Sequence, residues 1–308
     1  MSARQVARAI ATLREATAEA AWTQWSAILT LAASRRPAQS IVDPEALLLI
    51  SLALRDHEPR LWSAVVVWAQ FGARLLSVQR AKNLASLFPP EVRERLAEFA
   101  QLAMSDGGDQ RWRSLASQRA RPKAWKGRAR TAARRVDGGA ALMLRLRLGL
   151  GVGIKPDVLA YLIGHAGGRM AVVLIARGTA YQGRAVRRSL EDLVAAAFIE
   201  SWPTSPVSYR VDKATWAGLL EFDLKEPPAW RDWAGTYAFI AALDEWSRAL
   251  PQSELVLASE ARDLVAAHGR GIDPGVRAPM LDKYRDQEYL GPFVKTIEAC
   301  REFVERVV

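Results

Sequence analysis

The chain has 308 residues, of which half are hydrophobic and a quarter charged, as expected of a globular protein with two or three compact domains. Its one cysteine, Cys300, excludes an internal disulfide, and no apolar run reaches the ~18–20 residues that span a bilayer. The N-terminal stretch carries Glu15 and Glu19 and shows no secretory leader pattern. We therefore expect a cytoplasmic protein with no membrane partner.

The positive charge is concentrated in one segment. Residues 111–136 hold ten basic side chains and no acidic one, while the formal net charge of the whole chain is +10, so the remainder is close to neutral. A block of like charge repels itself and favours an anionic partner such as nucleic acid. The alternative is a basic linker without a ligand. The residues predicted to contact phosphates here are Arg111, Arg113, Arg119, Arg121, Lys123, Lys126, Arg128, Arg130, Arg134 and Arg135.

Residues 1–105 are predicted to form a helical N-terminal domain. Asp43 followed by Pro44 is typical of a helix start, because Asp caps free backbone N–H groups and proline fits the first helical position. Further helices are expected over 58–74, 77–87 and 90–104. The segment 106–139, marked by glycines at both ends and poor in aliphatic residues, is predicted to be a basic linker.

From Ala140 the apolar pattern returns and opens a central domain over 140–224. The series Gly149, Gly151 and Gly153 lacks the residue order of a phosphate-binding loop. We interpret it as the end of one helix, with the next helix beginning near Lys155.

Three short helices are expected next, over 157–166, 171–177 and 182–197, with Gly178, Thr179 and Ala180 breaking the last two apart. The run 170–176 is also compatible with a buried strand. On the third helix, Val186, Leu190, Leu193 and Ala197 form one buried stripe at helical spacing, so that Arg184, Arg187 and Arg188 project from the other side.

Two short strands are predicted after this helix, over 198–202 and 207–211, with a Pro-Thr-Ser-Pro turn between them. The hairpin forms a wing in which Ser208 and Arg210 are candidate phosphate contacts. A helix is expected from Lys213 to Leu220. Residues 225–308 then form a helical C-terminal domain, with helices starting at Pro227-Pro228, over 254–268 behind a Ser253 cap, and over 284–308.

The segment 176–200, ARGTAYQGRAVRRSLEDLVAAAFIE, resembles the winged helix-turn-helix proteins of bacteria. The stretch 144–164, LRLRLGLGVGIKPDVLAYLIG, is similar to winged-helix proteins encoded beside nucleotidyltransferase-type toxin genes. The chain departs from the first pattern at Ala180, where such turns commonly carry glycine. The resemblance implies a mostly α fold with a central winged helix, and a regulator or antitoxin-like protein.

The function expected from these observations is sequence-specific binding of double-stranded DNA by a transcriptional regulator, most simply a repressor of its own operon. The alternative is an antitoxin-like or defence-system protein that uses the winged helix to dock a protein partner, and a homodimer is compatible with either. The chain has no motif of an enzyme, a metal site or a cofactor site. The candidate base-reading residues are Thr179, Tyr181, Gln182, Arg184, Arg187 and Arg188.

Overall fold

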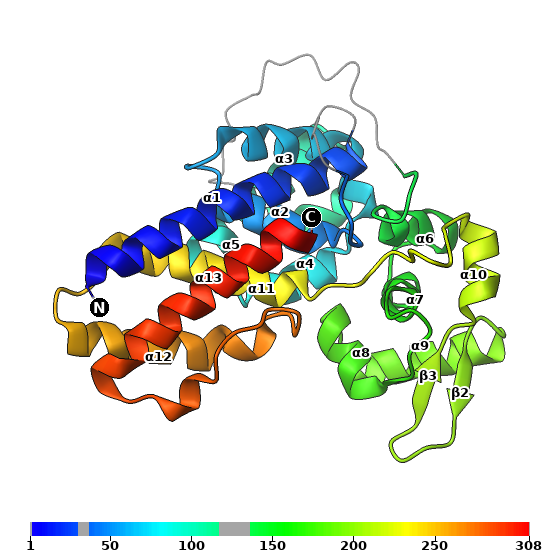
Figure 1. Ribbon diagram of the computed structural model, residues 1–308. Coiled ribbons are helices and arrows are strands. Elements are labelled where there is room, and N and C mark those ends of the chain that lie inside the picture. The colour runs from blue at the N-terminus through cyan, green and yellow to red at the C-terminus, as the bar shows by residue number, and fades with distance from the viewer. Residues whose placement is uncertain (1, 30–36, 117–135, 308) are drawn as a thin grey trace.

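The computed structural model describes residues 2–29, 37–116 and 136–307. These residues form thirteen α-helices and one small antiparallel sheet of three strands (Figure 1), so the predicted mostly helical fold is confirmed. Among the described helices, none combines the length and the apolar character needed to cross a bilayer.

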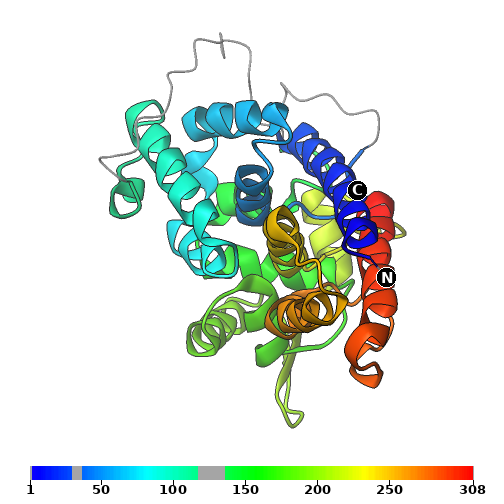
Figure 2. The same ribbon diagram turned by 90° about the vertical axis from the view of Figure 1, so that its left-hand side faces the viewer.

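The larger part of the molecule is a helical body made from both ends of the chain. Its first and last helices lie side by side in both views (Figures 1 and 2), and the residues expected to form separate N-terminal and C-terminal domains share one hydrophobic core. Each of these two helices is amphipathic, and part of the apolar side of each is covered by the other. The body consists of α1 (Ala3–Ile28), α2 (Pro44–Ala53), α3 (Pro59–Phe71), α4 (Val78–Ala85), α5 (Pro90–Ser105), α11 (Trp233–Trp246), α12 (Glu254–His268) and α13 (Leu290–Val307).

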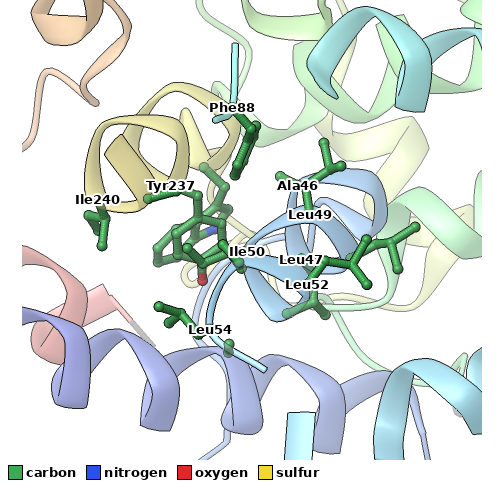
Figure 3. Packing of buried hydrophobic residues seen from close by; sticks show 14 of the residues in the cluster. Ala46, Leu47, Leu49, Ile50, Leu52, Leu54, Phe88, Tyr237 and Ile240 are labelled. Carbon is green, nitrogen blue, oxygen red and sulfur yellow. The ribbon is translucent and has the colours of Figure 1, made fainter. Parts of the chain in front are cut away.

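Helix α2 is the centre of this body. All ten of its residues are buried, as expected for a helix that is apolar on every side. Figure 3 shows its leucine and isoleucine side chains projecting in several directions, with Tyr237 of α11 beside Ile50. The predicted Asp43 cap is confirmed, because the Asp43 carboxylate accepts a hydrogen bond from the Ala46 N–H at 3.0 Å.

The beginning of the predicted basic linker belongs to the helical body. A short 3-10 helix, η2 (Gln110–Ser114), packs against α5. Trp112 is fully buried, and its ring meets that of Phe99 edge-on with centroids 5.0 Å apart.

A second hydrophobic core holds the smaller part of the molecule, at the right of Figure 1. Its three strands pair in the order β1–β3–β2, all antiparallel. The predicted helix 213–220 is confirmed, and the two predicted strands are shorter than expected. The elements are α6 (Leu142–Leu150), α7 (Ile154–Gly164), β1 (Met170–Ala171), α8 (Val172–Thr179), α9 (Gly183–Ala195), β2 (Glu200–Trp202), β3 (Ser208–Arg210) and α10 (Lys213–Leu220).

The predicted helix start at Pro227-Pro228 was wrong, because α11 begins only at Trp233. The preceding residues are held by tertiary contacts: Ala229 bridges to Ser40, and the Trp230 N–H donates to the Gly164 carbonyl at 3.0 Å. Because these backbone groups already form hydrogen bonds with other segments, they do not require the hydrogen bonds of a helix. The predicted range of α12 is confirmed, although Ser253 makes no side-chain cap bond.

Candidate nucleic-acid interface

Helices α8 and α9 are joined by a tight turn at Ala180. This residue adopts the left-handed conformation, with φ 57° and ψ 34°, and its N–H still bonds to carbonyls of α8. The helix therefore runs through Gly178 and Thr179, which were expected to break it. Gly178 is required by close packing, because a Cβ there would lie 2.2 Å from the ring of Tyr161 on α7.

Helix α9 has a buried side and an exposed basic side. Val186, Leu190 and Leu193 are buried against α7 and α8, as predicted, whereas Ala197 lies beyond the end of the helix and is exposed. On the opposite side Arg184, Arg187 and Arg188 are exposed, and none of them forms a hydrogen bond or ion pair with any residue the structure describes. Glu191 and Asp192 share this side, and Asp192 pairs with Lys155 at 2.9 Å.

The turn between α8 and α9 is held by side chains of α4, from the other core. Arg80 Nε donates to the Thr179 carbonyl at 2.8 Å, and Asn83 Nδ2 donates to the Ala180 carbonyl at 3.2 Å. The Tyr181 hydroxyl donates to Asp157 Oδ2 at 2.8 Å and lies 3.3 Å from Ser77 Oγ, at the start of α4. Three consecutive residues of the turn are thus fixed, and with them the direction in which α9 leaves it.

Arg80 and Arg147 belong to a buried ion network with three carboxylates, those of Asp43, Glu45 and Asp157. Arg80 bonds to Asp43 at 2.5 and 2.6 Å and to Glu45 at 2.6 Å. Arg147 is bidentate to Asp157, at 2.7 and 2.8 Å, and to Glu45, at 2.6 and 3.0 Å. All five side chains are at most 3 % exposed, so charges from α2, α4, α6 and α7 meet out of contact with water.

The pKa values of this network follow from burial opposed by the guanidinium charges. For Asp43, burial is outweighed by the charge and hydrogen bonds of Arg80, so its pKa is lowered. For Asp157, burial prevails over the attraction of Arg147, and its pKa is raised. Burial, together with the charge of Asp157, also raises the pKa of Tyr181, which keeps its hydroxyl protonated as a donor.

A hairpin lies beside α9 and encloses a groove with it. The inner side of the sheet carries Tyr209, whose side chain is buried in the second core, while the hairpin tip, residues 203–207, is exposed. The groove between α8, α9 and this tip has a volume of about 1020 Å³. Arg184 and Arg187 line it from α9, and Val173 lines it from α8. We call it the arginine groove.

Two of the predicted base-reading residues point inward, which corrects that expectation. Thr179 is fully buried, and its hydroxyl donates to the Ile175 carbonyl at 2.6 Å. The Tyr181 hydroxyl donates to Asp157, as described above. Both side chains serve the packing of the turn, so neither is available to a ligand in this conformation. Gln182, at the start of α9, is exposed together with the three arginines.

The predicted phosphate contacts are scattered. Ser208 and Arg210 lie on β3, where Ser208 Oγ is 3.0 Å from Thr204 Oγ1 and Arg210 pairs with Glu200 at 2.8 Å. Arg111 and Arg113 lie on η2 in the helical body, where Arg111 pairs with Asp109 at 2.6 Å. The remaining ones lie outside the described residues: Arg119, Arg121, Lys123, Lys126, Arg128, Arg130, Arg134 and Arg135.

Two surface features were missed by sequence reasoning. Arg169, just before β1, is exposed and stacks on the ring of Trp202. Val173 and Leu174 on α8 are 70 % and 46 % exposed, which is unusual for large apolar side chains next to a basic helix. The only signal for the second feature was the lack of polar residues in this helix.

Within the described residues, no three His, Cys, Asp or Glu side chains are grouped so as to hold a metal ion. No protein-family model, curated protein or solved structure matches the chain. The case for a function therefore depends on the residues and geometry described above.

Proposed function

We propose that residues 140–224 form a winged helix-turn-helix domain that binds double-stranded DNA, with α9 in the major groove, and that the protein is a sequence-specific transcriptional regulator. The observation that carries this proposal is the exposed side of α9. Three guanidinium groups project from it with no partner in the described part of the chain, beside a hairpin that bounds a groove.

The order of the elements supports this proposal. Helix α7, strand β1, helices α8 and α9 and the hairpin β2–β3 follow one another, and β1 pairs with β3. An order of this kind is expected of a domain in which a second helix enters DNA and a hairpin flanks it as a wing. With 13 residues, α9 is about 20 Å long, and a helix fits the ~12 Å width of the major groove.

The chemistry of the exposed side supports the same ligand. Arg184 is followed at helical spacing by Arg187 and Arg188, so the three lie along one side of α9. Each guanidinium has donors in a planar fork that matches O6 and N7 of guanine. Gln182, exposed at the start of the helix, is the further candidate for reading a base. The proposed phosphate contacts are Ser208 and Arg210 together with the basic residues of 111–135.

At the level of the cell, we propose a repressor of its own operon that acts in the bacterial cytoplasm on the nucleoid. A homodimer would place two copies of α9 on the two halves of a palindromic site.

The experiment begins with genomic footprinting of the tagged protein, which identifies the bound sequence. Fluorescence anisotropy then compares the wild-type protein with the variant Arg184→Gln, Arg187→Gln, Arg188→Gln on that duplex. The matched control removes three exposed arginines from the helical body: Arg4→Gln, Arg8→Gln, Arg93→Gln. Loss of one bidentate contact costs about 1–3 kcal/mol, so the α9 variant is expected to bind at least tenfold more weakly than the control. Equal affinities would refute the assignment of α9.

The second candidate is an antitoxin-like or defence-system protein that docks a protein in the arginine groove. It is favoured by the exposure of Val173, which is 70 % exposed and lines that groove. A large apolar side chain gains nothing from contact with DNA phosphates, whereas the centre of a protein interface is rich in apolar side chains. The variant Val173→Ser distinguishes the two. It leaves DNA affinity unchanged if the ligand is DNA, and it weakens co-purification with the product of the adjacent gene if the ligand is that protein.

A further inference from the structure

Two arginines lie over the ring of Trp202, at the end of β2. The guanidinium carbon of Arg169 is 4.4 Å from the centroid of the Trp202 ring, and that of Arg210 is 4.3 Å away. At such distances each cation is attracted by the π-electrons of the indole. The three side chains come from separate segments, so the tertiary fold is what assembles them. We call them the stacked cluster.

The stacked cluster lies on the outer face of the sheet, away from α9. Trp202 pairs with Ser208 and Glu200 pairs with Arg210, and residues paired across strands project to the same face. Tyr209, which lies between Ser208 and Arg210 on β3, projects to the other face and is buried in the core. Basic groups therefore flank the hairpin on both sides, those of the arginine groove inside and those of the stacked cluster outside.

Stacking leaves the cluster ready to bind an oxyanion. A guanidinium attracted to the indole through its charge makes no hydrogen bond with the ring, so its N–H donors remain available. Arg169 is exposed and forms no hydrogen bond or ion pair with any residue in the described ranges. Arg210 is paired with a single carboxylate, Glu200, through Nε, so its terminal nitrogens are uncommitted. Two cations thus face one carboxylate, and both lie over the same indole ring.

We infer that Arg169 and Arg210, held by Trp202, form a second phosphate-binding surface on the outer face of the hairpin. Its ligand is the backbone of the DNA strand on the far side of the hairpin from α9. This inference deepens the proposed function and rests on it.

The position of the hairpin favours DNA over a protein partner. In the proposed complex, with α9 in the major groove, the hairpin beside it lies against the phosphate backbone that borders this groove. The tip, Pro203-Thr204-Ser205-Pro206-Val207, carries no charge. Attraction to the phosphates must then come from the faces of the hairpin, and the outer face is where Arg169 and Arg210 lie.

The test measures how DNA affinity depends on salt for the full chain. A phosphate contact contributes about −0.9 to the slope of log K against log salt. We expect Arg169→Gln to reduce the steepness by about this amount and to weaken binding equally on the footprinted duplex and on a random duplex. Arg93→Gln, which removes the same charge from α5, is expected to change neither. Trp202→Leu keeps both charges but removes their support, and it is expected to weaken binding as well.

Hydroxyl-radical footprinting supplies a second readout. The deoxyribose positions of the backbone beyond the hairpin are expected to lose protection in Arg169→Gln, while those around α9 keep it. If the wild-type protein binds DNA through α9 but Arg169→Gln leaves both slope and footprint unchanged, the inference is wrong and the proposed function stands. If the wild-type protein does not bind DNA, or binds independently of the α9 arginines, both are overturned.

Discussion

Replacing Arg80 by methionine is the sharpest test of the buried ion network behind the turn that precedes α9. The side chain is 0 % exposed and bonds to Asp43, to Glu45 and to the Thr179 carbonyl that begins the turn. Methionine fills a similar volume but has no donor. Asp43 then loses its ion-pair partner and keeps the Ala46 N–H, while Glu45 keeps Arg147 and the Ser77 N–H.

The expected destabilisation follows from breaking a buried pair on one side. Removing one partner of a buried ion pair costs about 3–5 kcal/mol, because the other charge remains without compensation. This is a large part of the roughly 5–15 kcal/mol by which a folded protein is usually stable. The control Arg93→Met, at an exposed position of α5, is expected to change the free energy of unfolding by less than about 0.5 kcal/mol.

The loss also depends on pH in a defined direction. In the wild-type protein the pKa of Asp43 is lowered, so its contribution to stability is complete above the unfolded pKa and disappears only as the pH falls towards the folded value. In the variant the buried carboxyl has lost its cation, so its pKa is expected to be raised by burial and the unfolded state releases this proton at a lower pH than the folded state. The variant is therefore expected to lose about 1 kcal/mol or more of stability, relative to the wild-type protein, as the pH rises from about 5 to about 7.5.

Urea unfolding followed by circular dichroism at the two pH values measures both effects. A destabilisation below about 1 kcal/mol, or one that is the same at both pH values, would refute the reasoning that Arg80 compensates buried carboxylates.

Three further changes test separate parts of the structure. Ala180→Gly relieves a left-handed alanine and is expected to raise stability by about 0.5–1 kcal/mol, whereas Ala185→Gly within α9 lowers it by about 1 kcal/mol; a thermal melt with the opposite order contradicts the role of the turn. Tyr181→Phe removes the donor to Asp157 and is expected to cost about 1.5–3 kcal/mol, and a neutral effect on urea unfolding would exclude this bond. Burial raises the pKa of Cys300 to about 12, so the folded protein is expected to resist a thiol reagent at neutral pH and to react once unfolded; rapid labelling of the native chain would show that the thiol is accessible.

Elements with local signals were predictable from the sequence. The Asp43-Pro44 start, the helix 213–220 and the helix 254–268 each depend on residues within one or two turns, and all three are found. The buried stripe of α9 followed from spacing alone, because Val186, Leu190 and Leu193 repeat at the period of a helix.

Features that depend on distant residues were not predictable. Arg80 lies in a helix whose sequence predicts an exposed polar side. In the structure it is fully buried, forms ion pairs with Asp43 and Glu45, and donates to the Thr179 carbonyl, 99 positions away in the chain. The same contacts turn Thr179 and Tyr181 inward, although their positions in the sequence are typical of base-reading residues. One signal was present: Arg147 interrupts a strongly apolar run, and a charge in such a run needs a buried partner.

The central claim is that the arginines of α9 read bases in the major groove. The most direct test is the protection of guanine N7 from methylation on the footprinted duplex, with the wild-type protein and with the variant Arg184→Gln, Arg187→Gln, Arg188→Gln. We predict that the wild-type protein protects specific guanines and that the variant, at concentrations that saturate the duplex, leaves them reactive. Protection that persists in the variant, or a wild-type complex in which every guanine N7 stays reactive, would contradict this account.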